Sequence, residues 1–160
     1  MKRIVSSIAI VVGAAVISVS CAANKQVSAE QEQAVQRAIA AKDFEIEAST
    51  AIPMRGRSVP LTSFYSLAVK GDSVYSNLPY FGQAYNIPYG GGSGLIFDST
   101  VKNYNVASGK RGANIITFQA QSPDGKVEYT VEIQSEGSAS ILVNSQNRQA
   151  IRFDGKLVAE

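Results

Sequence analysis

The chain has 160 residues, of which one is cysteine and none is histidine or tryptophan. Without histidine, the usual serine and cysteine hydrolases and histidine-ligated zinc sites are excluded, and a single cysteine excludes an intramolecular disulfide. Lys2 and Arg3 account for the net charge of +2, so the rest of the chain is electrically balanced and predicts no nucleic-acid partner. The glycine-rich stretches lack the spacing of phosphate-binding motifs. We therefore expect no cofactor and no metal.

The first 20 residues predict an export signal. Lys2 and Arg3 precede an apolar stretch, residues 4–19, that is shorter and more interrupted than the roughly 20 apolar residues of a membrane span. The stretch ends at Cys21 in a pattern that resembles the lipobox of bacterial lipoproteins, in which the cysteine receives the lipid. Ser18 stands where a lipobox has a larger aliphatic residue. The alternative is an ordinary secretory signal that leaves Cys21 as a free thiol.

We expect the mature chain to start with a tether, residues 21–27, followed by one β-rich domain over residues 28–160. Ser28 and Gln31 have the spacing of a capping box, and the following residues, up to Lys42, are good helix formers. Val35 and Ile39 lie on one side of this predicted helix. The helix is weakly amphipathic and is expected to pack on the edge of the domain.

After the helix the hydrophobic period changes from 3.6 to 2. Residues 43–48 alternate between charged and apolar, which predicts a half-buried strand. Two further strands are predicted around a hairpin turn at Gly71 and Asp72. A segment rich in proline, glycine and tyrosine, residues 78–94, separates them from a short strand over residues 95–98.

The C-terminal third predicts four strands joined by short turns. Residues 126–134 alternate strictly between polar and apolar, and turns are expected at residues 123–125 and at residues 136–137. The fold class is therefore mainly β, an antiparallel meander that forms a sandwich or an open barrel, with one N-terminal α-helix.

The segment Leu78-Pro79-Tyr80-Phe81-Gly82-Gln83-Ala84-Tyr85 resembles the core of an uncharacterised family of Bacteroidota lipoproteins known as domain of unknown function 4251 (DUF4251). The stretches 72–74, 94–97 and 137–139 match the same pattern, so that the resemblance covers roughly residues 44–155. Gln83 departs from it, because a basic residue is common there. The resemblance implies a lipid-anchored domain of the cell envelope and brings no catalytic residue with it.

The location follows from the same resemblance. Surface display of lipoproteins in Bacteroidota is linked to acidic residues just after the lipidated cysteine, and residues 22–26 contain none. We therefore expect a protein anchored by its lipid in the outer membrane and facing the periplasm.

The tyrosine-rich segment is the strongest candidate for a binding site. Tyr80, Phe81, Tyr85 and Tyr89 combine apolar rings with polar tips, which suits a peptide or a glycan partner. The alternative is that these aromatic residues plug one end of the sheet.

Carboxylates are the one enzymatic chemistry left open. Asp72 and Asp98 flank the aromatic segment and could converge to cleave a glycosidic bond. Glu128 and Glu132 are expected on a solvated strand face, and Asp124 and Asp154 in turns before glycines. We therefore predict a non-enzymatic binding protein, with a hydrolase of envelope glycans or a purely structural lipoprotein as alternatives.

Two serines match the short acceptor pattern for O-glycosylation in Bacteroidota. Ser73 and Ser99 each follow an aspartate and precede a small or apolar residue. Ser73, expected in an exposed hairpin turn, is the favoured acceptor of the two.

Overall fold

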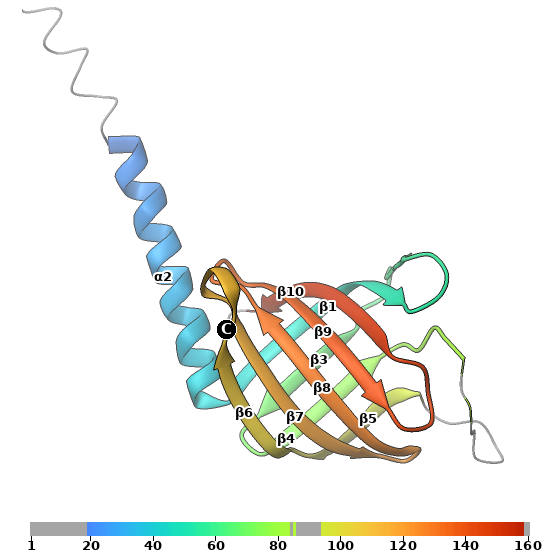
Figure 1. Ribbon diagram of the computed structural model, residues 1–160. Helices are drawn as coiled ribbons and strands as arrows, with labels where there is room; N and C mark the ends of the chain where they lie inside the picture. The colour runs from blue at the N-terminus through green and yellow to red at the C-terminus, as the bar shows by residue number, and fades with distance from the viewer. Residues whose placement is uncertain (1–18, 84, 86–93, 159–160) are drawn as a thin grey trace, which may run out of the picture.

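The computed structural model describes residues 19–83, 85 and 94–158. An antiparallel sheet curls into a nearly closed barrel, and a helix crosses one of its open ends (Figure 1). The elements are α2 (Val19–Ala41), β1 (Asp43–Pro53), β2 (Val59–Pro60), β3 (Ser66–Lys70), β4 (Ser73–Leu78), β5 (Leu95–Thr100), β6 (Lys102–Ser108), η1 (Lys110–Gly112), β7 (Asn114–Ser122), β8 (Gly125–Ile133), β9 (Ser138–Ser145) and β10 (Ile151–Val158). The predicted fold class is confirmed, with a barrel in place of the alternative sandwich.

The strands are hydrogen-bonded in the order β5-β4-β3-β1-β10-β9-β8-β7-β6, and β2 pairs with β1. The first long strand and the last strand are therefore neighbours in the middle of the sheet. The two edges of the sheet approach each other where β5 contacts β7. There the backbone N–H of Gln121 donates to Ser99 Oγ at 3.2 Å, which nearly closes the barrel.

The C-terminal meander follows the predicted alternation. The apolar side chains of β8 point into the barrel and are fully buried, whereas those between them face outward. A two-residue turn, Pro123 and Asp124, joins β7 to β8, and Gly71 and Asp72 form a similar turn between β3 and β4. Both predicted turns are confirmed.

Gly155 marks the place where the barrel wall is bent. The pairing of β1 with β10 shifts register between Ala48 and Thr50, which is a β-bulge. A Cβ atom at Gly155 would lie 2.0 Å from the backbone oxygen of Glu47. Only glycine fits this close approach of the two backbones.

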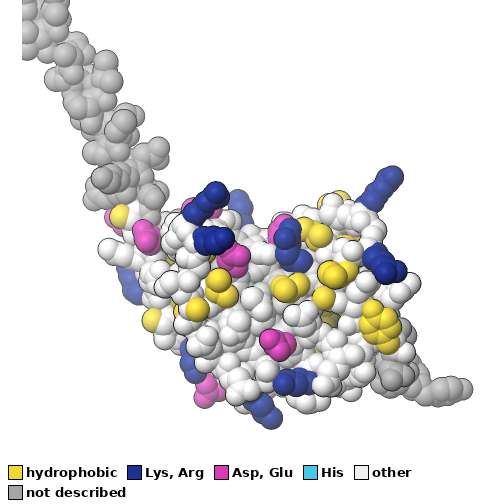
Figure 2. Space-filling model, in the orientation of Figure 1, with side chains coloured by type: hydrophobic (Ala, Val, Ile, Leu, Met, Phe, Trp, Pro, Cys, Tyr) yellow, Lys and Arg dark blue, Asp and Glu magenta, His cyan; other side chains and the backbone are white. Residues whose placement is uncertain are grey.

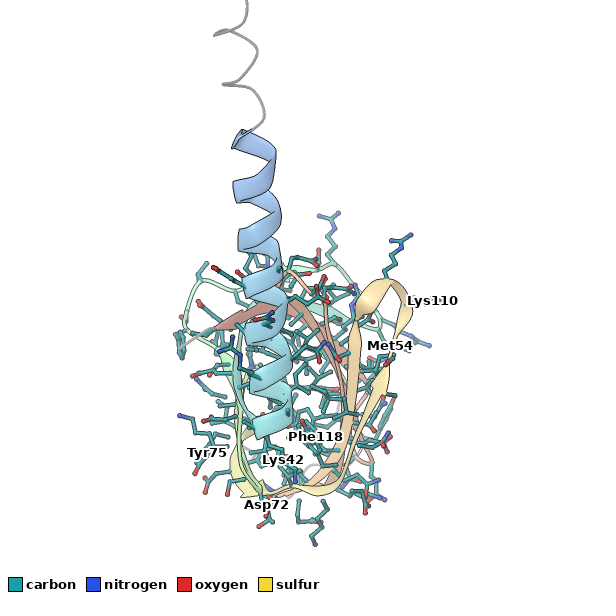
Figure 3. The ribbon with its side chains drawn as sticks, turned by 90° about the vertical axis from the view of Figure 1, so that its left-hand side faces the viewer. Lys42, Met54, Asp72, Tyr75, Lys110 and Phe118 are labelled. Carbon is teal, nitrogen blue, oxygen red and sulfur yellow. The ribbon has the colours of Figure 1, made fainter. Side chains whose placement is uncertain are left out.

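Helix α2 is held on the barrel through two side chains. Val35 and Ile39 belong to the buried core, and the helix ends at Ala41, after which Lys42 has a left-handed φ of 52°. The hydroxyl of Tyr104 donates to the backbone oxygen of Ile39 at 3.4 Å. Figure 3 looks onto this end of the molecule and shows α2 lying across the mouth of the barrel, with Lys42 at the end nearer Asp72.

The helix starts earlier than the sequence predicts. It begins at Val19, so residues 21–27, which were expected to form a tether, are helical, and Ser28 is not an N-cap. The physical reason is that alanine, lysine and glutamine dominate residues 22–26, and these are good helix formers with no stop signal among them. In the part of the chain that the structure describes, no helix is long and apolar enough to cross a membrane.

One pair of hydroxyls links opposite walls of the barrel, and stacked aromatic rings join two neighbouring strands. Phe118 stacks on Tyr129 with ring centroids 5.0 Å apart. The Tyr129 hydroxyl donates to Ser76 Oγ at 3.1 Å, and Ser76 Oγ donates to the backbone oxygen of Leu95 at 2.6 Å. Burial raises the pKa of Tyr129 above its usual value near 10, because the phenolate would lose its hydration, although the Ser76 hydroxyl lowers that pKa in part. The hydroxyls of Tyr129 and Ser76 inside the barrel are thus both hydrogen-bonded.

Candidate functional site

The segment between β4 and β5 comprises residues 79–94, and its described residues, 79–83, 85 and 94, lie at the end of the barrel opposite α2 (Figure 1). We call it the aromatic loop. Tyr80, its first aromatic residue, is partly buried and packs against the core. The Tyr80 hydroxyl lies 2.9 Å from the backbone oxygens of both Gln83 and Gln149, to either of which it can donate its proton. Tyr80 therefore fastens the loop to the connection between β9 and β10.

Arg148 lies beneath this tyrosine and forms a buried ion pair. Its guanidinium carbon is 5.0 Å from the centroid of the Tyr80 ring, which is a cation–π geometry. Arg148 Nη2 also donates to Asp124 Oδ2, and the two side chains are only 9% and 3% exposed. Burial raises the pKa of Tyr80, while its hydrogen bond to Gln149 and the nearby Arg148 charge act in the opposite direction.

Asp124 lies in a turn before a glycine, as expected, but its side chain is buried. The β9–β10 connection folds over the turn that contains Asp124, and the side-chain amide of Asn147 donates to the Asp124 backbone oxygen. The turn that contains Asp124 is also held by Ser122, whose Oγ accepts a hydrogen bond from the Asp124 N–H at 3.1 Å. The sequence offers no motif for this contact, because Asp124 and Arg148 are 24 residues apart and lie in two different connections.

The two next described aromatic residues of the loop face solvent. Phe81 is 37% exposed and Tyr85 is 66% exposed. The backbone around them is fixed, since Tyr85 N–H donates to the Asn147 oxygen at 2.8 Å and Gln149 N–H donates to the Gln83 oxygen at 3.0 Å. Tyr89 lies outside the described residues. The loop thus divides its aromatic residues, with Tyr80 turned toward the barrel and Phe81 and Tyr85 presented outward.

Asp72 and Asp98 are both on the outside of the barrel, in different settings. Asp72 lies in the β3–β4 turn at the helix end, where Lys42 Nζ is 3.2 Å from Asp72 Oδ1. Asp98 is exposed on β5 and pairs across the sheet with Tyr75. The labelled side chains Tyr75 and Asp72 in Figure 3 lie along the same outer wall.

A different pair of carboxylates shares one surface hollow. Glu132 and Asp154 line a depression of 390 Å³ on the outer face of β8, β9 and β10. Each pairs across the sheet with Ser140, so they lie in one row, with their α-carbons two strand spacings, or about 10 Å, apart. The expectation that Asp154 lies in a turn is wrong, because Gly155 continues β10 through the bulge opposite β1.

These two carboxylates already have protein partners. Glu132 Oε1 accepts from the side-chain amide of Gln134 at 2.9 Å, and Asp154 Oδ1 lies 3.3 Å from Arg152 Nε. Figure 2 shows acidic and basic side chains interspersed on the face that it presents, with small apolar areas between them. Among the residues that the structure describes, no three acidic or thiol side chains gather as a metal site would need.

The two predicted glycosylation sites differ in their surroundings. Ser73 is the first residue of β4, follows the exposed turn at Gly71 and Asp72, and is itself partly buried, as is Ser99. Ser99 is partly buried, and its hydroxyl accepts the Gln121 N–H that joins the two sheet edges. Cys21, the predicted lipid attachment site, lies in the first turn of α2.

Comparison with known proteins agrees with this fold. The model of the family DUF4251, a domain of unknown function, matches residues 26–157. A crystal structure of a DUF4251 family protein from Bacteroides eggerthii is similar, with a TM-score of 0.62 and 20% sequence identity over 81% of this chain and 87% of that one. No curated protein matches the chain. Because the family model spans most of the sequence, the chain belongs to the DUF4251 family.

Proposed function

We propose that this protein is exported and anchored by a lipid on Cys21 to the periplasmic face of the outer membrane. There it binds a peptide or a glycan through the aromatic loop, without catalysis. The observation that carries the binding proposal is the exposure of Phe81 and Tyr85 on a backbone that is fixed by hydrogen bonds. Aromatic residues are enriched at binding hot spots, and side chains on backbone that is already held by hydrogen bonds lose little backbone entropy on binding.

The described aromatic residues of the loop differ in their roles, and this difference supports the proposal. The loop is held on the barrel by Tyr80, Arg148 and Asp124, whose polar groups contact one another or the backbone. Phe81 and Tyr85 make no comparable contribution to closing the barrel and remain open to a ring or a chain of the partner. Tyr89 belongs to the proposed surface by sequence alone.

Replacement of the outward aromatic residues tests the binding proposal. Partners would be captured from native envelopes with the wild-type protein and with a Phe81→Ala/Tyr85→Ala variant, and quantified by mass spectrometry. A partner that is lost from the variant at unchanged melting temperature supports the proposal. Equal capture by both proteins refutes it.

Metabolic labelling with an alkynyl fatty acid tests the anchor. The wild-type protein is expected to carry the label, and Cys21→Ser is expected to lose it. The apolar stretch that ends at Cys21 supports this expectation. A wild-type protein without label would contradict it.

The row formed by Glu132, Ser140 and Asp154 favours a second candidate, a hydrolase of envelope glycans. Glu132 and Asp154 place two carboxyl groups on one hollow, and a pair of carboxyl groups is what most glycosidases use to cleave a glycosidic bond. The test is the release of sugar from isolated envelope glycans by the wild-type protein and by Glu132→Gln. Sugar release by the wild-type protein but not by Glu132→Gln would favour the hydrolase. If the wild-type protein releases no sugar, the hydrolase is excluded. A purely structural lipoprotein is expected to show neither partner loss nor sugar release.

A further inference from the structure

A slot of 320 Å³ lies between α2 and the mouth of the barrel. Val35 and Ile39 hold the helix on the core and Ala38 packs against it. Ala34 and Ala38 line the slot on the helix side with side chains too small to fill it. Phe44, Leu157 and Val158 line it on the strand side. The volume is at the lower end of the range for small-molecule sites, which often lie in the mouths of β-barrels.

The rim of this slot carries two cations and two anions. Arg37 comes from the helix, Lys70 from the end of β3, and Asp43 and Glu45 from the start of β1. None of the four forms an ion pair with another described residue, although cross-strand register places Asp43 beside Lys70. The rim is therefore electrically neutral but has charges of both signs free to meet a ligand.

We propose that this slot binds a single-chain amphiphile with a zwitterionic head group. The apolar chain occupies the space between the alanines of α2 and the wall formed by Phe44 and Leu157. The negative part of the head group faces Arg37 and Lys70, and its positive part faces Asp43 and Glu45. An anionic head group would meet the two carboxylates and bind less well. This site is separate from the aromatic loop, which lies at the other end of the barrel.

The test is calorimetric titration of the purified full chain, in detergent-free buffer, with dodecylphosphocholine below its micelle concentration. Wild-type protein is expected to bind it saturably at one site. Ala38→Phe fills the slot and is expected to weaken binding at least about tenfold. Ala40→Phe is the matched control, because Ala40 is exposed on the helix outside the slot and its replacement should leave affinity unchanged.

Two further arms separate the parts of the proposal. Lys70→Ala changes an exposed side chain at a strand end, so this variant tests the charged rim even if Ala38→Phe displaces the helix. Lys70→Ala should weaken the binding of dodecylphosphocholine about fivefold. Dodecyl sulfate should bind more weakly than dodecylphosphocholine. The proposal is overturned by the absence of saturable binding, by unchanged affinity in both Ala38→Phe and Lys70→Ala, or by tighter binding of dodecyl sulfate.

Discussion

The guanidinium of Arg148 and the carboxylate of Asp124 form an ion pair that is almost completely removed from water. The same guanidinium lies under the ring of Tyr80, so this pair joins the β7–β8 turn, the β9–β10 connection and the aromatic loop. The end of the barrel opposite the helix is thus closed by polar contacts as well as by apolar packing. Its integrity depends on both partners being present.

Removal of one partner should therefore be costly. Asp124→Ala leaves a buried guanidinium without its counter-charge and is expected to lower the free energy of unfolding by about 3–5 kcal/mol. Arg152→Ala is the matched control, because its ion pair with Asp154 is about half exposed, and it should cost about 0–1 kcal/mol. Urea denaturation of both variants measures this difference. Similar losses of unfolding free energy in the two variants would show that the buried ion pair does not stabilise the fold more than the exposed one.

Alkaline pH should destabilise the fold through Tyr129. Its pKa is raised in the folded protein relative to the unfolded value near 10, so the folded state holds the proton more tightly. The resulting stability is fully present below pH 10 and is lost as the pH rises further, by about 1.4 kcal/mol per pH unit. The measurement is denaturant unfolding at several pH values from 8 upward.

Tyr129→Phe provides the control for this pH dependence. The variant loses the hydrogen bond to Ser76, which should cost about 1 kcal/mol at neutral pH. Its stability should then fall less steeply above pH 10 than that of the wild type. An equally steep fall would assign the alkaline transition to other groups, such as Tyr80 and Tyr104, whose pKa values burial also raises.

Gly155→Ala should disturb the bulge between β1 and β10. The added methyl group would meet the Glu47 backbone oxygen at 2.0 Å, and the backbone cannot move aside as a side chain does. The free energy of unfolding is therefore expected to fall by about 3 kcal/mol or more. Gly71→Ala is the comparison, because its methyl group meets nothing within 4 Å and only its φ of 61° is unfavourable. That variant should cost about 1–2 kcal/mol. Thermal unfolding that ranks Gly71→Ala as the more damaging would contradict the described register.

The strands and their turns could be predicted because each depends on local pattern. Inward and outward side chains alternate along residues 126–134, and Gly71 and Gly125 supply the backbone freedom that two-residue turns need. The sequence predicts the start of α2 too late, because Ser28 and Gln31 have the spacing of a capping box, whereas in the structure the helix runs through them. Local pattern thus predicts the strands more closely than the length of the helix.

The candidate sites could be predicted only in part. The aromatic loop is visible in the sequence because its composition is unusual. Its division into an anchoring Tyr80 and outward Phe81 and Tyr85 could not be predicted, because it depends on Arg148, which follows Tyr80 by 68 residues in the chain. The row of Glu132, Ser140 and Asp154 depends on strand register, which the sequence does not specify. Contacts between distant connections need the folded chain.

The central claim, that the outward aromatic residues of the loop touch a partner, is tested most directly by photo-cross-linking in intact cells. A benzophenone amino acid would replace Tyr85 in one strain and Val106 in another, since both side chains are exposed but Val106 lies on β6, outside the aromatic loop. We expect a discrete cross-linked product at Tyr85 that is absent at Val106. No product at Tyr85, or the same product at both positions, would contradict the account.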